Sequence, residues 1–321
     1  MLKILTIGAA VQDVFLSHSE EFKPVSDVKA HEVFMKLDLG AKADVNNINF
    51  STGGGATNAA VTFSRQGIST EFMGTIADDP AGKAVLDDLD NENVGTKHIS
   101  YSDKLHTGYS VLLLAPNGER TILTYRGAST HYDEKNFDID KIDANWIYLS
   151  SMAGNMEILN KIFTTAKKKD IKIFFNPGKN ELKQIDKLKT LLEDVDVLSV
   201  NKDEAKLIVN GDSLNELIHR LLTYVPLAII SDGPNGVIAS DGKTIIRAGM
   251  YEDVKVVDRT GAGDAFGSGF LAYWANGKSL KDSIVFASAN STSVVTKIGA
   301  KAGILHKGVV LHAMPLDEKP F

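Results

Sequence analysis

Short apolar runs recur along the chain and alternate with stretches in which apolar residues fall at helical spacing. The runs cover residues 3–8, 146–149, 171–175, 195–200 and 227–231, and polar, Gly or Pro residues bound each of them. Short segments that are apolar throughout are typical of strands buried on both faces. Helical spacing is found at 56–66, 155–169, 203–209 and 214–224. We therefore expect an α/β fold with a mostly parallel central sheet.

Two segments interrupt this alternation. Residues 15–50 are charged and weakly periodic, and residues 107–126 hold two apolar runs around Pro116-Asn117-Gly118, a sequence that indicates a β-hairpin. We expect a small β-rich lid over a site, although an edge extension with no role in ligand binding has the same pattern. The predicted division assigns to the lid residues 13–51 and 99–130, and to the α/β core residues 1–12, 52–98 and 131–321.

Composition narrows the function classes. The 321 residues are 43% apolar and 24% charged, as in ordinary globular proteins, and the net charge of −6 lacks the basic footprint of a nucleic-acid-binding protein. The absence of cysteine excludes disulfides, thiolate metal sites and cysteine nucleophiles. The apolar start of the chain is too short for a signal peptide, and no uncharged apolar stretch reaches the ~20 residues that span a bilayer. We expect a cytoplasmic protein with neither nucleic-acid nor membrane partners.

The sharpest motif is the Gly-rich turn Thr260-Gly261-Ala262-Gly263-Asp264, which follows an apolar approach and precedes a helix-like segment. Free N–H groups at the start of that helix would face an anion. A carboxylate there competes with the anion if the turn only caps a helix. The carboxylate is explained if Asp264 removes a proton from a hydroxyl group and that hydroxyl attacks a phosphoryl group held by those amides.

A second Gly-rich segment lies 200 residues earlier. Gly53, Gly54 and Gly55 precede a helix in which Asn58 offers both a donor and an acceptor, which suits sugar hydroxyls. Asp13, just after the first predicted strand, adds an acceptor for hydroxyl protons. A glycine triplet alone is more often a simple turn.

Two weaker motifs follow predicted strands. Asn201 and Glu204 share a helix face and could organise Mg²⁺ through water, although on the local sequence helix capping is the better explanation of the pair. The turn Ser231–Gly236 suits nucleotide phosphates, but an ordinary turn has the same composition. Walker A, G-x-G-x-x-G and G-x-S-x-G motifs are absent, and the eight His lack metal-ligand spacing.

Taken in order, these segments resemble the ribokinase-like (PfkB) carbohydrate kinase family, and the resemblance covers nearly the whole chain. It also includes Gly74…Asp78-Asp79-Pro80-Ala81-Gly82, Arg126-Gly127-Ala128, Asn176-Pro177-Gly178 and Gly299-Ala300. It implies a three-layer α/β sandwich with a β-sheet lid, ATP with Mg²⁺, and transfer of a phosphoryl group to a hydroxyl, most simply a hydroxymethyl group, of a small sugar.

The resemblance also implies roles for individual residues. Asp264 is the general base, and the amides of Gly261, Ala262 and Gly263 stabilise the transferring phosphoryl group. The substrate is held by Asp13, Gly54, Gly55 and Asn58. The nucleotide site is lined by Asn201, Glu204, Ser231, Gly233, Gly236, Ser288 and Asn290. Glu204 contacts Mg²⁺ through water, and a monovalent cation such as K⁺ is served by Asp258 and Thr260.

Some positions depart from the family pattern. Arg259 stands where a small residue or Pro is usual, which puts the cation site in doubt, and Ala77 replaces a glycine. Ser150-Ser151-Met152 stands where ribokinase has a sugar-binding Glu, which argues against strict ribose specificity. Two alternatives stay open. One is a nucleoside kinase in which the base of the substrate stacks on the lid residues Phe15, Phe34, Met35 and Phe50, although these residues fit the core of the lid slightly better. The other is a non-catalytic sugar- or nucleotide-binding regulator. Open strand edges of the lid could pair across a homodimer.

Overall fold

The computed structural model describes residues 1–27, 32–116, 119–132 and 137–321 and has a ten-stranded sheet at its centre. Its seven parallel strands are, in spatial order, β7 (Gly95–Ser102), β6 (Ser69–Ala77), β1 (Lys3–Ile7), β10 (Trp146–Leu149), β11 (Lys172–Phe175), β12 (Val197–Asn201) and β13 (Ala228–Ser231). Three antiparallel strands extend it: β14 (Val237–Ser240), β15 (Thr244–Ala248) and β16 (Leu316–Pro320). The expected α/β fold with a mostly parallel sheet is confirmed.

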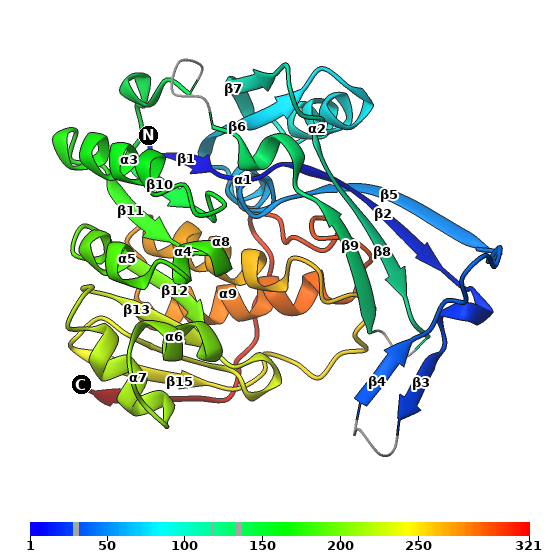
Figure 1. The fold of residues 1–321 in the computed structure, drawn as a ribbon. Coiled ribbons are helices and arrows are strands. Elements are labelled where there is room, and N and C mark those ends of the chain that lie inside the picture. The colour runs from blue at the N-terminus through cyan, green and yellow to red at the C-terminus, as the bar shows by residue number, and fades with distance from the viewer. Residues whose placement is uncertain (28–31, 117–118, 133–136) are drawn as a thin grey trace.

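Helices cover both faces of this sheet (Figure 1). One face packs against α3 (Met156–Lys168), α4 (Lys179–Leu182), α5 (Ile185–Leu192), α6 (Lys202–Ile208) and α7 (Leu214–Leu221). The other packs against α1 (Gly55–Arg65), α8 (Ala262–Trp274) and α9 (Leu280–Val294), with α2 (Pro80–Asn91) near β6 and β7. Neighbours on β10 show why the strands are apolar throughout, since Ile147 packs into the first layer and Tyr148 into the second.

A smaller four-stranded sheet projects from the large one, to the right in Figure 1. Its order is β5 (Asn47–Gly53), β2 (Val11–Ser17), β8 (Gly108–Leu114) and β9 (Arg120–Tyr125), and the pair β3 (Pro24–Asp27) and β4 (Glu32–Met35) lies near its far end. We call the four-stranded sheet the lid. β8 and β9 are the expected hairpin, whose turn Asn117-Gly118 lies outside the described residues.

The lid strands run from Val11 to Gly53 and from Gly108 to Tyr125. The expected division placed 99–102 in the lid, whereas these residues belong to β7 in the large sheet. The start of β2 at Val11 likewise precedes the expected boundary after residue 12.

The lid has two different faces. On the inner face, Phe15 packs with Leu112, Leu114 and Ile298 of the core. The strand register places Phe50 and Leu123 on the opposite, outer face, where they are 63% and 57% exposed. Arg120 and Thr124 alternate with the outer residues and share the inner face, and Arg126 directly follows the strand.

Contacts between distant parts of the sequence join the two halves of the core. α1 packs along α8, where Ser268 Oγ donates a hydrogen bond to Thr62 Oγ1 at 2.8 Å across 206 residues. Val61 of α1 packs with Ala265 of α8 and Val294 of α9. No helix in the described residues is both long enough and apolar enough to cross a bilayer.

Candidate active site

Two neighbouring cavities lie where the parallel strands end, beside the start of α8. The first, of about 330 Å³, is bordered by β12, β13, α8 and α9, and we call it the α9 cavity. The second, of about 310 Å³, reaches from the start of α1 to the lid strand β9, and we call it the lid cavity. Asp264, Glu204 and Asn176 line both. Carboxyl ends of parallel strands are where ligands usually bind in open α/β sheets.

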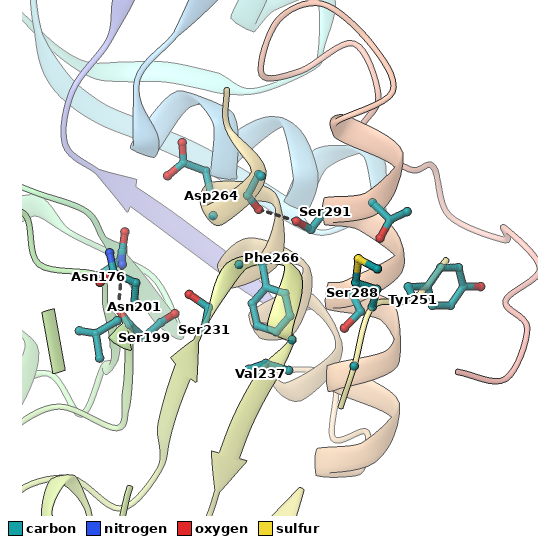
Figure 2. Close-up of a pocket in the computed structure, with 18 of the residues that line it drawn as sticks. Asn176, Ser199, Asn201, Ser231, Val237, Tyr251, Asp264, Phe266, Ser288 and Ser291 are labelled. Atoms are coloured by element: carbon teal, nitrogen blue, oxygen red, sulfur yellow. Dashed lines mark hydrogen bonds between the residues drawn. The ribbon is translucent and has the colours of Figure 1, made fainter. Parts of the chain in front are cut away.

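The α9 cavity combines polar turns with an apolar patch (Figure 2). Its polar lining includes Asn176, Ser199, Asn201, Ser231, Ser288 and Ser291, and its apolar lining includes Val237, Met250, Tyr251 and Phe266. Of the seven residues expected at the nucleotide site, six line this cavity: Asn201, Glu204, Ser231, Gly233, Gly236 and Ser288. Asn290 does not, because its side chain is fully buried and bonds Ala265 O and Leu305 N.

The lid cavity collects residues from far apart in the sequence. Gly54 and Gly55 line it together with Asp264, as expected. Hydroxyl and cationic side chains that were not expected there also line it, namely Thr124, Arg126, Ser129, Ser150 and Ser151. Asn58 is 4% exposed and lies behind this wall.

Asp264 lies in the first turn of α8, on the wall that both cavities share. Its Oδ2 accepts a hydrogen bond from Asn58 Nδ2 at 2.8 Å. Burial raises the pKa of the Asp264 carboxyl above its ordinary value, and the bond from Asn58 opposes that rise. A Cβ on Gly55 would lie 3.2 Å from Oδ1, so the glycine leaves this oxygen accessible.

The turn before Asp264 needs glycine for its shape. Gly261 is in the left-handed region (φ 77°) and caps α8, and a Cβ there would overlap Ala300. Ala262 and Gly263 line the α9 cavity, and a Cβ on Gly263 would meet no atom within 4 Å. The first N–H groups of a helix have no partner within the helix. Ala262 N makes one long bond, of 3.4 Å, to Arg259 O, so this end of α8 can still donate to an anion in the cavity.

The turn before α1 approaches the first strand closely. Gly54 has φ of 101°, and a Cβ there would overlap the carbonyl oxygen of Ala9. Only glycine therefore fits where β5 meets α1 beside β1. Ala9 and Gly54 both line the lid cavity at this point.

Asp13 lies outside both cavities in the described structure. Its side chain is 5% exposed and lies against Gly53 on the inner face of the lid. Burial raises the pKa of Asp13 to about 6. Nearby, Lys301 Nζ donates to Thr52 Oγ1 and Asp88 Oδ2, both at 2.7 Å. This buried cation therefore connects the lid strand β5 with α2.

Asn201 and Glu204 form a reciprocal capping box at the start of α6. Glu204 N donates to Asn201 Oδ1 and Asn201 N donates to Glu204 Oε2, each at 2.9 Å. Glu204 nevertheless lines both cavities, and burial raises the pKa of its carboxyl. The pair is thus compatible with capping and with a role in the site.

Asp258 is fully buried and fixes the loop that leads into α8. Its Oδ1 accepts from Thr260 N at 3.0 Å and Thr260 Oγ1 at 2.7 Å, and its Oδ2 accepts from Gly299 N at 3.0 Å. Arg120 of the lid places Nε 3.9 Å from Oδ1. The lid therefore meets this loop through an ion pair.

Sequence reasoning missed part of each cavity. Phe266 is two residues from Asp264 and on the same helix, which was a usable signal. Arg126 ends an expected strand, but only the folded lid shows which cavity it faces. Phe34 and Phe50, expected near a base, are exposed, and Phe15 is packed in the lid.

Comparison with known proteins gives one family. The pfkB family carbohydrate kinase model matches residues 27–307. A ribokinase of Haemophilus influenzae is 27% identical over 270 residues, covering 80% of this chain and 85% of the relative. An ATP-dependent 6-phosphofructokinase of Thermoanaerobacterium thermosaccharolyticum is 27% identical over 281 residues, covering 83% and 85%.

A solved structure extends the likeness to the fold. The structure of Arabidopsis thaliana ribokinase complexed with ribose and ATP has a TM-score of 0.76 and covers 95% of this chain and 96% of that one. The two sequences are 20% identical, so this match concerns the fold alone. The expected family and the ribokinase-like fold are confirmed.

Proposed function

Because the chain belongs to the pfkB family of carbohydrate kinases, we propose that it transfers the γ-phosphoryl group of ATP to a hydroxyl group of a small sugar. The lid cavity holds the sugar and the α9 cavity holds the nucleotide. The names ribokinase and 6-phosphofructokinase belong to different sugar kinases, so the relatives do not select one sugar for this chain.

The position of Asp264 carries the proposal. It lines both cavities at the start of α8, so its carboxylate can contact a hydroxyl in the lid cavity while the helix amides face a phosphate in the α9 cavity. Asn58 orients one carboxylate oxygen and leaves Oδ1 for the substrate. A general base needs hydrogen-bond access of this kind to the proton that it removes.

In the proposed step, Asp264 accepts the proton of the sugar hydroxyl. The hydroxyl oxygen forms a bond to the γ-phosphorus as the bond from that phosphorus to the β,γ-bridging oxygen breaks, and ADP leaves with those electrons. The amides at the start of α8, among them those of Ala262 and Gly263, stabilise the negative charge on the transferring group. Gly261 sets the shape of the turn.

The remaining α9 cavity residues suit a nucleotide. Ser231 and Ser288 offer hydroxyl groups, and Tyr251, Phe266 and Val237 offer apolar surface for a base. Glu204 fits Mg²⁺, because one carboxylate oxygen caps α6 and the side chain still lines both cavities. When bound, Mg²⁺ would neutralise phosphate charge.

Asp258 and Thr260 do not fit a resident monovalent cation. The carboxylate already accepts three hydrogen bonds from the chain, and the Arg120 guanidinium already faces its negative charge. A second cation would place two positive charges beside one carboxylate. We therefore assign charge balance at Asp258 to Arg120.

A sugar suits the lid cavity better than a nucleoside. Its described lining is rich in hydroxyl groups and glycines, and the aromatic residues expected to stack on a base lie elsewhere. The outer face of the lid, with Phe50 and Leu123 exposed, supports a homodimer formed through the lid.

The assignment of Asp264 is tested with Asp264→Asn. We expect turnover, followed as ADP release over a panel of sugars and nucleosides, to fall by ~10²–10⁴ while ATP still binds. Asp87→Asn, an exposed residue of α2 that lines neither cavity, is the matched control. Near-normal turnover by Asp264→Asn would exclude Asp264 as the base, and turnover with nucleosides alone would exclude the sugar assignment.

A further inference from the structure

We propose that the sugar carries an anionic substituent, a carboxylate or a phosphate, that Arg126 binds; this inference rests on the proposed function. Arg126 directly follows β9 and caps the short 3-10 helix η2 (Gly127–Thr130). Together with Thr124, it lines the lid cavity that also contains Asp264. A guanidinium group thus lies at the wall of the cavity assigned to the phosphoryl acceptor.

The charge of Arg126 is unmatched in the part of the chain that the structure describes. No carboxylate there pairs with it, whereas Arg120, at the other end of β9, is matched by Asp258. The two arginines therefore differ: one braces the lid and the other faces an open cavity. Arg126 is also exposed, so its donors are free for a ligand.

An anionic ligand in the lid cavity would need a cation beside it, because two other residues of the lining are acidic. Asp264 and Glu204 both line the cavity, and their carboxylates would repel an anionic sugar. A planar guanidinium offsets that repulsion and can donate two parallel hydrogen bonds to a carboxylate or a phosphate. The hydroxyls of Thr124, Ser129 and Ser151 supply further donors.

The γ-phosphate of ATP is a second anion that Arg126 could reach in a shared site. The sugar is the better assignment because Arg126 lines the lid cavity and not the α9 cavity, where the nucleotide is placed. Loss of a contact to the sugar lowers kcat/KM for the sugar, whereas loss of a contact to the γ-phosphate raises the KM for ATP. One set of variants therefore distinguishes the two assignments.

The test uses matched neutral and anionic acceptors: D-glucitol against D-gluconate, and D-fructose against D-fructose 6-phosphate. The full-length protein should bind or phosphorylate one anionic member at least tenfold better than its neutral partner. Arg126→Gln should lower kcat/KM for that compound by about 10- to 100-fold, as loss of a charged hydrogen bond does. Arg126→Lys should retain part of it, and the KM for ATP should change little.

Arg247→Gln is the control, since Arg247 is an exposed arginine of β15 that lines neither cavity. Preference for the neutral members, or an Arg126→Gln variant that raises the KM for ATP alone, would overturn the inference. Calorimetric binding of the four compounds gives a readout that does not need turnover. It separates failure of this inference from failure of the kinase assignment, which Asp264→Asn tests.

Discussion

Arg120 Nε of the lid lies 3.9 Å from Oδ1 of Asp258, the fully buried carboxylate that fixes the loop before α8. This pair connects the strand that carries Arg126 with the turn that carries Asp264. The same carboxylate binds the backbone of Thr260 and Gly299, so one charge holds three segments together.

Arg120→Gln should lower the free energy of unfolding by about 2 kcal/mol, because a buried carboxylate loses its nearest cation but keeps its hydrogen bonds. Urea denaturation of Arg120→Gln, Asp258→Asn and the double variant measures the coupling, which we expect to be about 1 kcal/mol. Additive effects of the two substitutions would show that the pair contributes nothing.

The pair of Arg120 and Asp258 also predicts that neither the activity nor the stability of the protein depends on a specific monovalent cation. If Arg120 balances the charge of Asp258, turnover in KCl should equal turnover in choline chloride at the same ionic strength. Melting temperatures in the two salts should also agree, which gives a readout without catalysis. A specific activation by K⁺ would restore the cation to Asp258 and Thr260.

Asn58→Ala should move the acid limb of the pH–activity profile to higher pH. Asp264 must be ionised to accept a proton, and the Asn58 hydrogen bond favours the ionised form. Its removal raises the pKa of Asp264 further, so activity is lost at a higher pH as the solution is acidified. Thr62→Ala, which removes another α1–α8 hydrogen bond one turn away, should leave the limb in place.

Asp13→Asn should stabilise the protein near neutral pH. The pKa of Asp13 is raised by burial to about 6, so ionisation of this side chain costs the folded state ~3 kcal/mol relative to an unfolded value near 3.8. The gain should be full above about pH 6 and vanish as the pH falls towards 3.8. Denaturation at pH 7 and pH 4 checks this, and equal effects at both would contradict it. The role of Asp13 in holding substrate stays a prediction that the KM of this variant tests.

Phe50→Asp should shift the proposed lid-mediated dimer to monomer. Phe50 is 63% exposed on the outer face, and a charge there opposes burial against a second copy. Light scattering after size-exclusion chromatography gives the mass. Val33→Asp, an exposed change on β4 outside the four-stranded sheet, is the comparison. A wild-type monomer at micromolar concentration would exclude the dimer.

The parallel strands could be predicted because burial on both faces leaves a continuous apolar run, as Ile147 and Tyr148 illustrate on β10. The turn into α8 could be predicted because Gly261 has a conformation that the sequence must encode locally. β16 could not, since most of its residues are exposed and its pairing with β15 alone makes it a strand.

The site was harder to predict where tertiary position decides. Asn290 and Ser288 lie on the same helix. The Asn290 side chain is fully buried and hydrogen-bonded to two backbone groups, whereas Ser288 lines the α9 cavity. Arg120 begins β9 and Arg126 directly follows it, and only their neighbours in the fold show that the first is paired and the second is not.

The packing of α1 on α8 has a consequence for synthesis. Asn58 and Thr62 leave the ribosome 206 residues before Asp264 and Ser268, an interval of ~10–40 s at usual elongation rates. During that time the part of α1 that packs on α8 and α9, which includes Val61, has no partner, so the nascent chain offers chaperones a defined surface. A chain released before α8 would carry the strands of the lid but would lack Asp264, the proposed base, and Ile298, on which Phe15 of the lid packs.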